Sequence, residues 1–150
     1  MLNPHAARIP QIIKFMQRSE KRDALLSESM SKNDIQNISK MIGKLFDHWQ
    51  LSNKEQLYLL GMNPEGRSSL TRFKKGNISK LSFDLKDRIS FLLSIHEKLR
   101  TLYPKNNEHC YSWIKMRNAI IDNYAPIEVM MKGIIGLSYI SDFLEEMINR

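Results

Sequence analysis

The stretch Ser52-Asn-Lys-Glu-Gln-Leu-Tyr-Leu-Leu-Gly61, followed by Arg67-Ser-Ser-Leu-Thr-Arg-Phe-Lys-Lys-Gly76, decides the fold because its pattern predicts two short helices joined by a turn. Ser52 and Glu55 form a capping box, in which the serine hydroxyl accepts from the Glu55 backbone N–H and the glutamate reaches back. Gly61 suits the end of the first helix, since glycine tolerates a positive φ. We therefore expect a first helix of about eight residues.

The residues between the two helices, Met62-Asn-Pro-Glu-Gly66, are typical of a turn with Pro64 in its second position. A helix that begins at Pro64 is the competing interpretation. The second helix is expected from Arg67 or Ser68 to Lys75. Ser68 is expected to cap this helix and Gly76 to end it, and Leu70 and Phe73 are expected to face inward.

The outer face of the second helix is polar and basic, and two short helices with such a face have the form of a helix-turn-helix motif. The residues predicted to bind DNA are Arg67, Ser68, Ser69, Thr71, Arg72, Lys74 and Lys75. The first three are assigned to base edges in the major groove, and Arg72 and the two lysines mainly to the DNA backbone. The alternative is an ordinary pair of packed helices with a solvated basic face.

Helical periodicity continues on both sides of this motif. A strong helix is expected from about Asp34 to Trp49, where apolar residues recur at intervals of three and four. The candidate caps for this helix are Ser31, Asn33 and Asp34. A longer helix is expected to open at Ser82 and Asp84 and to continue until Pro104, which forbids its continuation.

The remaining pattern is also helical. After a polar loop at 105–108, a helix is expected around 110–116, residues 118–124 are ambiguous, and another helix runs from Pro126 to Met131. A terminal helix is marked by Leu137, Ile140, Leu144 and Met147. Residues 1–30 show only a weak pattern and are predicted to form an N-terminal arm. The expected fold class is all-α.

Composition and charge favour a folded chain with two kinds of partner. The content of 42% hydrophobic and 26% charged residues is ordinary for a globular protein. Residues 1–104 carry 18 Lys/Arg against 10 Asp/Glu, a balance of +8, whereas 105–150 carry 5 against 6, a balance of −1. A basic region suits a nucleic acid backbone and a near-neutral tail suits a protein partner, while a solvated basic face with no partner is the alternative.

The single cysteine, Cys110, fits a reducing compartment, and no signal peptide or membrane span is expected, so the predicted location is cytoplasmic. The histidines and the cysteine share no metal-ligand spacing, and the pairs Asp84/Asp87 and Glu145/Glu146 look like solvated faces. Gly133-Ile-Ile-Gly136 lacks the features of a phosphate loop and is interpreted as a helix-to-helix turn. We therefore expect no enzyme, metal or cofactor. Packing rather than binding is expected of Met41, Phe46, Trp49, Phe91 and Phe143.

Two stretches carry a resemblance to a known family. The first is Leu59-Leu-Gly61 with Arg67-Ser-Ser-Leu-Thr-Arg-Phe-Lys-Lys-Gly76. The second is Arg88-Ile-Ser-Phe-Leu-Leu-Ser-Ile-His-Glu-Lys-Leu99, followed by Trp113-Ile114, Asn118, Pro126-Ile-Glu-Val-Met130, Gly133 and Gly136-Leu137. In these residues the chain resembles the Xre/MbcA/ParS antitoxins, in which an Xre-type helix-turn-helix precedes a toxin-binding domain. The chain departs from that pattern in a longer turn before Arg67, in Arg117 where a proline is usual, and in Ala125 where a capping Ser or Thr is usual.

The resemblance implies a type II antitoxin that binds a cognate toxin, usually a NAD-consuming RES-domain protein, and represses its own operon. It divides the chain into an arm at 1–30, an Xre-like helix-turn-helix domain at 31–80 and a toxin-binding domain at 81–150. The residues that it marks for toxin binding are Trp113, Asn118, Pro126, Glu128, Gly133, Asn149 and Arg150, the last two as a tail that enters the toxin site. A homodimer or higher toxin-antitoxin assembly on operator DNA is expected, since one short recognition helix reads few base pairs. The alternatives are a stand-alone transcription regulator and a pure interaction module.

Overall fold

The computed structural model describes residues 30–150, so the arm predicted for residues 1–30 lies outside these residues apart from Met30. Within this part of the chain the regular elements are helices, and the single β-bridge joins Asn118 to Tyr124. The all-α prediction is confirmed. None of the described helices is both long and apolar enough to cross a membrane.

The first helices begin at serine caps. Helix α2 (Lys32–His48) starts after Ser31, whose hydroxyl accepts from the Asp34 backbone N–H at 3.1 Å. Ser31 is therefore the cap among the three candidates, and the helix starts slightly earlier than predicted. Helix α3 (Asn53–Leu60) starts at the predicted capping box, because Ser52 Oγ accepts from Glu55 N at 3.1 Å and the Glu55 carboxylate accepts from Ser52 N at 2.8 Å.

The turn between α3 and α4 fixes the start of the second helix. The Gly66 N–H donates to the Asn63 carbonyl at 2.8 Å, which places Pro64 in the second position of the turn as predicted. Helix α4 (Arg67–Lys74) begins only after this turn, so the competing start at Pro64 is wrong. The cap predicted at Ser68 is also wrong, because Gly66 occupies the N-cap position and no side chain bonds there.

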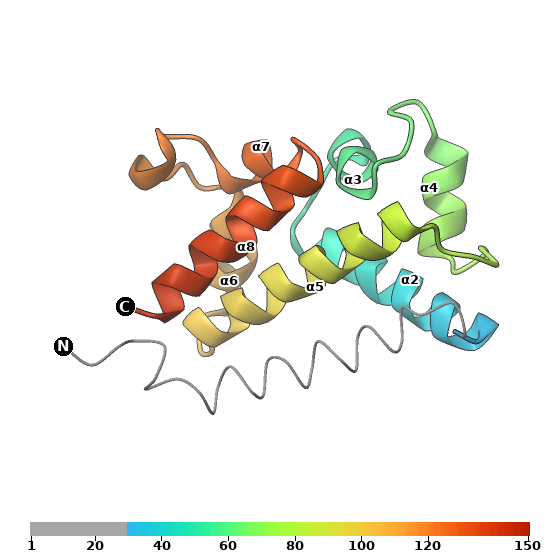
Figure 1. Cartoon of the computed structure of the whole chain (residues 1–150), viewed down its shortest axis with the longest axis horizontal. Helices are drawn as coiled ribbons and strands as arrows, with labels where there is room; N and C mark the ends of the chain where they lie inside the picture. The colour runs from blue at the N-terminus through green and yellow to red at the C-terminus, as the bar shows by residue number, and fades with distance from the viewer. Residues whose placement is uncertain (1–29) are drawn as a thin grey trace.

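Helix α5 (Phe83–Leu102) is the central element of the molecule (Figure 1). It begins at Ser82, whose hydroxyl accepts from Leu85 N at 3.1 Å, and it ends before Pro104 as predicted. It packs against α2 and α3 on one side and α8 on the other, so one continuous core runs through both halves of the chain. The division of the chain at residue 80 stays a prediction.

The C-terminal half consists of short helices around α8. Its elements are α6 (Asn107–Ser112), η2 (Trp113–Lys115), η3 (Ala119–Ile121), α7 (Pro126–Met130) and α8 (Ile134–Ile148). Helix α6 begins inside the predicted loop, because the Asn106 side chain accepts from His109 N at 3.0 Å and caps it. The turn predicted at 133–136 is partly helix: Gly136 lies in the first turn of α8, where a Cβ would collide with the Val129 carbonyl oxygen.

Four of the five methionine and aromatic residues assigned to packing do pack. Phe46, Trp49 and Phe143 are buried and Phe91 is half-buried against the core. The prediction for Met41 is wrong, because its side chain is about half exposed. It stands one position before the buried Ile42 and therefore about 100° further round the helix.

Candidate nucleic-acid interface and C-terminal surface

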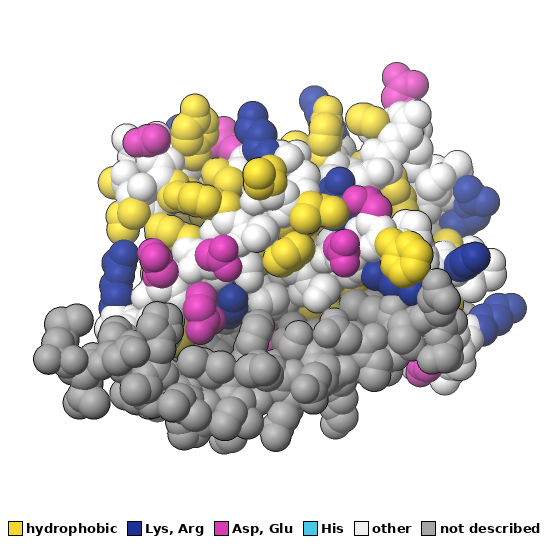
Figure 2. Space-filling view, in the orientation of Figure 1, with side chains coloured by type: hydrophobic (Ala, Val, Ile, Leu, Met, Phe, Trp, Pro, Cys, Tyr) yellow, Lys and Arg dark blue, Asp and Glu magenta, His cyan; other side chains and the backbone are white. Residues whose placement is uncertain are grey.

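Helix α4 presents one face to the core and the opposite face to solvent. Leu70 and Phe73 are buried against its neighbours α2 and α3, as the sequence predicted. Because successive residues are about 100° apart, the face opposite this pair carries Ser68, Arg72 and Lys75. All three are exposed. Helix α4 lies at one end of the molecule (Figure 1), and Lys and Arg side chains gather at that end (Figure 2).

The other predicted DNA-binding residues lie at the edges of this face. Arg67 and Thr71 are exposed and Ser69 is half-buried. The Thr71 hydroxyl donates to the Arg67 carbonyl at 3.0 Å, and Arg72 Nη2 donates to Ser69 Oγ at 3.4 Å. The bond to Ser69 holds the guanidinium of Arg72 along the helix surface.

Lys74 is placed differently from the rest of the set. Its Nζ pairs with Asp47 of α2 at 3.0 Å, and its stem lies where a Cβ on Gly43 would be 3.4 Å from Lys74 Cγ. The amine is therefore engaged in holding α4 on α2. Only 28% of the Lys74 side chain is exposed, in contrast to the exposed Lys75.

Two exposed lysines that were not predicted flank α4. Lys40 lies almost one turn before Gly43, the residue of α2 that touches the Lys74 stem, and Lys80 lies in the segment that leaves α4. The net charge of the region indicated a basic surface. The net charge did not show where Lys40 and Lys80 lie in space. Only the packing of α2 against α4 shows this.

Arg88 of α5 holds the end of α3. Its Nη1 donates to the carbonyls of Tyr58 and Leu59 at 3.2 and 3.4 Å, and its Nε donates to Asp84 at 2.8 Å. A cation at a helix C-terminus is favoured by the helix dipole. Gly61 has φ 66° and contacts the guanidinium, since a Cβ there would lie 2.5 Å from Arg88 Nε. The first helix of the motif is thereby fixed on the central helix.

A short first helix, a turn and a second helix with a polar, basic outer face, all anchored on a helical core, define a helix-turn-helix protein. Residues 39–94 match the family of the antitoxin Xre-like helix-turn-helix domain. The match runs from α2 into α5 and includes all of α3 and α4. This stretch is therefore similar to an antitoxin Xre-like helix-turn-helix domain, and the match supports a DNA-binding antitoxin or regulator. Comparison with curated proteins and with solved structures gave no match.

Three of the residues assigned to toxin binding serve the packing of the C-terminal half. Trp113 is buried and its ring stacks on Phe143 with centroids 6.2 Å apart. Pro126 is buried in the first turn of α7. Gly133 has φ 96° and ψ −163°, a conformation that is essentially restricted to glycine, and it starts α8.

Asn118 and Glu128 bond to nearby backbone. The Asn118 carboxamide accepts from Ile120 N at 2.9 Å and caps η3. The Glu128 carboxylate accepts from Ala125 N at 2.7 Å, which leaves α7 with the glutamate half of a capping box and no hydroxyl. The loss of a cap at Ala125 that the sequence predicted is confirmed.

Asn149 and Arg150 lie at the far end of α8 from Gly133. Asn149 is the C-cap residue, and its N–H donates to the Glu145 carbonyl at 3.0 Å. At 1.5 Å per residue, α8 separates this end from Gly133 by roughly 20 Å. The residues marked for toxin binding are therefore spread along the C-terminal half and do not form one cluster.

The exposed apolar residues of the C-terminal half were not predicted as a site. Figure 2 shows apolar side chains gathered over the half of the molecule that contains α7 and α8. The large exposed ones in this half are Met116, Ile120, Tyr124, Ile135 and Tyr139. We call these five residues the C-terminal apolar surface. Ile135, which is 79% exposed, and Tyr139 stand one turn apart on α8. The helical period separates them from the buried Leu137 and Ile140, and this signal could have been found in the sequence.

Buried polar groups set the register of α8 on α5. The amine of Lys98 donates to the backbone carbonyl and hydroxyl of Ser141 at 3.0 and 2.9 Å and pairs with Glu145 at 3.4 Å. The hydroxyls of Ser94 and Ser141 are 3.2 Å apart. Because a buried charge must keep its partners, this network admits one register of the two helices.

The histidines and the cysteine form no metal site in residues 30–150. Tyr111 of α6 stacks between His48 and His96, with ring centroids 4.6 and 5.7 Å apart. Burial, followed by the charges of Arg100 and His48, lowers the pKa of His96 from its ordinary value of 6.5. Burial also raises the pKa of the Cys110 thiol, although Arg100 opposes this shift.

Proposed function

We propose that this protein is a type II antitoxin, which represses its own operon through α4 and neutralises a cognate toxin through its C-terminal half. The observation that carries the proposal is the outward face of α4 within an Xre-like antitoxin domain. The protein would act in the cytoplasm, where both its operator and its toxin are found.

For the DNA-binding half, Ser68 and Arg72 would face base edges, with Arg67 and Ser69 beside them. Lys75 would contact phosphate, together with Lys40 and Lys80. Lys74 would act mainly through α2, since its amine is paired with Asp47. An eight-residue recognition helix spans few base pairs, and we infer that two copies bind a two-fold operator.

For the toxin-binding half, the proposed contact is the C-terminal apolar surface together with the tail Asn149–Arg150. Exposed apolar side chains that gather on one part of a surface are typical of protein interfaces, and this half of the chain carries a charge near neutrality. The proposed partner is a RES-domain toxin that consumes NAD. Trp113, Asn118, Pro126, Glu128 and Gly133 would support this surface rather than contact the toxin.

Growth rescue tests the proposal directly. The chain is co-expressed with the product of the adjacent gene, which should arrest growth alone and lose its toxicity in the presence of this chain. Ile135→Ser with Tyr139→Ser should abolish rescue and leave binding to the promoter intact. Arg72→Ala with Lys75→Ala should do the reverse, and Met41→Ser, which changes an exposed apolar residue elsewhere, should affect neither.

A stand-alone helix-turn-helix regulator is the second candidate. It is favoured by the extent of the family match, which covers the helix-turn-helix and ends at residue 94. In that case the neighbouring product would be harmless or would stay toxic, while the chain would still bind its own promoter.

A further inference from the structure

The connection between α2 and α3 is strained and is held from outside the helix-turn-helix. Gln50, which follows the end of α2, has φ 53°, a left-handed conformation that residues other than glycine rarely adopt. Such a conformation persists where its surroundings hold it in place. The amine of Lys115 donates to the Gln50 carbonyl, so a residue 65 positions further along the chain supplies part of that hold.

The same lysine reaches the first turn of α3. Its Nζ lies 3.6 Å from the Glu55 carboxylate, which also accepts from Ser52 N in the capping box of that helix. Only 23% of the Glu55 side chain and 39% of the Lys115 side chain are exposed, so solvent screens this pair only in part. Lys115 therefore joins the connection after α2 to the start of α3.

Two further contacts connect the C-terminal half to the ends of these helices. The ring of Tyr111 stacks on His48, the last residue of α2, with centroids 4.6 Å apart. The guanidinium of Arg88, which donates to carbonyls in the last turn of α3, lies beside Gly133, where a Cβ would be 4.0 Å from Arg88 Nη2. Residues 111, 115 and 133 all lie beyond residue 94, where the family match ends.

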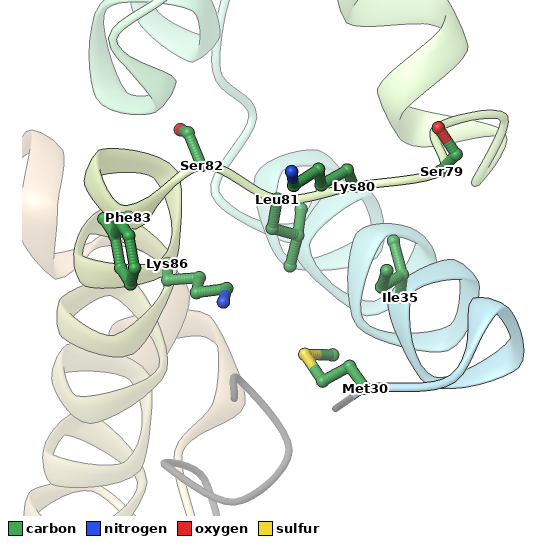
Figure 3. Close-up of a pocket in the computed structure, with 8 residues that line it drawn as sticks. All are labelled: Met30, Ile35, Ser79, Lys80, Leu81, Ser82, Phe83 and Lys86. Atoms are coloured by element: carbon green, nitrogen blue, oxygen red, sulfur yellow. The ribbon is translucent and has the colours of Figure 1, made fainter. Parts of the chain in front are cut away.

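The position of α4 depends on the positions of α2 and α3. Leu70 and Phe73 of α4 are buried, and the helices against which α4 packs are these two. Residues 79–82, which lead from α4 to α5, line a hollow (Figure 3), and of these four only Leu81 is buried. That segment therefore constrains α4 less than α2 and α3 do. A change in the angle between α2 and α3 would move α4.

We propose that Lys115 is a positioning residue for DNA binding, an inference that rests on the proposed function of α4. Through its bonds to Gln50 and Glu55, the lysine fixes α3 relative to α2. These two helices then hold α4 in the orientation that fits the major groove. The helix-turn-helix therefore needs the C-terminal half in order to bind its operator, although Lys115 itself makes no contact with DNA.

Promoter binding by the full chain tests this role, with fluorescence anisotropy measured for the promoter and for an unrelated duplex. Lys115→Met keeps the apolar stem of the lysine and removes the amine. A chain that spends only a fraction of the time in its binding-competent arrangement binds more weakly by that fraction. We expect about fivefold weaker binding to the promoter. Binding to the unrelated duplex and the salt slope should stay unchanged, because both depend on phosphate contacts.

Three variants separate positioning from a loss of charge or of folding. Lys115→Arg keeps donors for both partners and should restore most of the promoter binding. Glu55→Gln keeps the capping box, in which glutamine also serves, but removes the charge pair. It should weaken promoter binding about twofold, and should add nothing to Lys115→Met. Arg117→Ala removes an exposed cation that bonds to the Asn123 carbonyl and should leave promoter binding unchanged.

The outcomes separate this role from the proposed function. Promoter binding that is unchanged in Lys115→Met, or equally weakened in Arg117→Ala, overturns the positioning role. A salt slope lowered by about one in Lys115→Met also overturns it, because the lysine would then contact phosphate directly. If circular dichroism shows Lys115→Met to be unfolded, Glu55→Gln decides, and an unchanged Kd for that variant overturns the role. An unmodified chain without preference for its promoter overturns the proposed function, and this role with it.

Discussion

The contact between Gly61 and Arg88 allows a quantitative test of how the helix-turn-helix is fixed on α5. Arg88→Ala removes the two bonds to the end of α3 and the bond to Asp84. Hydrogen bonds from a charged donor contribute about 1.5–3 kcal/mol each, but these carbonyl bonds are long and Asp84 is exposed. We expect the free energy of unfolding to fall by about 2 kcal/mol in total.

Gly61→Ala acts through the same arginine. A non-glycine residue in the left-handed region costs about 1–2 kcal/mol, and the new Cβ would stand 2.5 Å from Arg88 Nε. The flexible arginine moves more easily than the backbone, so its bonds to α3 are lost as well. The single variant should therefore lose about 3 kcal/mol, the sum of the left-handed term and the arginine term.

The double variant separates this reasoning from independent effects. Once Arg88 is alanine, Gly61→Ala costs only the left-handed term, so the pair should lose about 3 kcal/mol rather than the additive value of about 5. Urea unfolding followed by circular dichroism measures all four chains, with Arg100→Ala as the control for an exposed arginine on the same helix. Additivity within about 0.5 kcal/mol would refute the assigned contact.

Three further predictions concern DNA binding by α4, the pH dependence of stability and the reactivity of the cysteine. Lys75→Ala should weaken promoter binding and reduce the salt slope of that binding by about one, whereas Lys74→Ala should leave the slope unchanged because its amine is paired with Asp47. Fluorescence anisotropy at several salt concentrations measures the slope for each variant. Equal slopes for the two variants would be inconsistent with the assignment. Because the pKa of His96 is lowered in the folded chain, the unfolded chain binds the proton more readily, so stability should be lost as the pH falls below about 6.5. Urea midpoints at pH 7.5 and 5.5 should differ less in His96→Asn than in the unmodified chain, and an unchanged difference would exclude His96 as the cause. The Cys110 side chain is buried and the pKa of its thiol is raised, so iodoacetamide at pH 8 should label it only after unfolding. Mass spectrometry measures the labelling, and rapid labelling of the folded chain would contradict this burial.

The helices could be predicted from sequence wherever a local rule decides the outcome. The capping box at Ser52, the turn around Pro64 and the end of α5 at Pro104 depend on residues that are neighbours in the chain. The predictions that failed were decided by neighbours in space or by a competing local bond. Gly136 looked like a turn residue, and only the carbonyl of Val129 shows that it is a close-packing position inside α8.

The candidate site shows the same division. The exposed face of α4 could be derived from the spacing of Leu70 and Phe73. The different position of Lys74 could not, because its partner Asp47 is 27 residues away in the sequence. Exposure of Ile135 and Tyr139 was hidden in an apolar run that also contains core residues, and separating them required the helical period to be applied within that run.

Binding of the chain to its own promoter tests the central claim, that α4 is the recognition helix of a DNA-binding antitoxin. Anisotropy titrations at 50–200 mM salt should give tighter binding to the promoter than to an unrelated duplex, with affinity that falls steeply as salt rises. Arg72→Ala with Lys75→Ala should abolish the preference, because Arg72 faces base edges, and should lower the salt slope by about one, because Lys75 contacts phosphate, while Arg100→Ala, which removes a positive charge far from α4, should change neither. Equal affinity for both duplexes, or a preference that survives the double substitution in α4, would contradict the account.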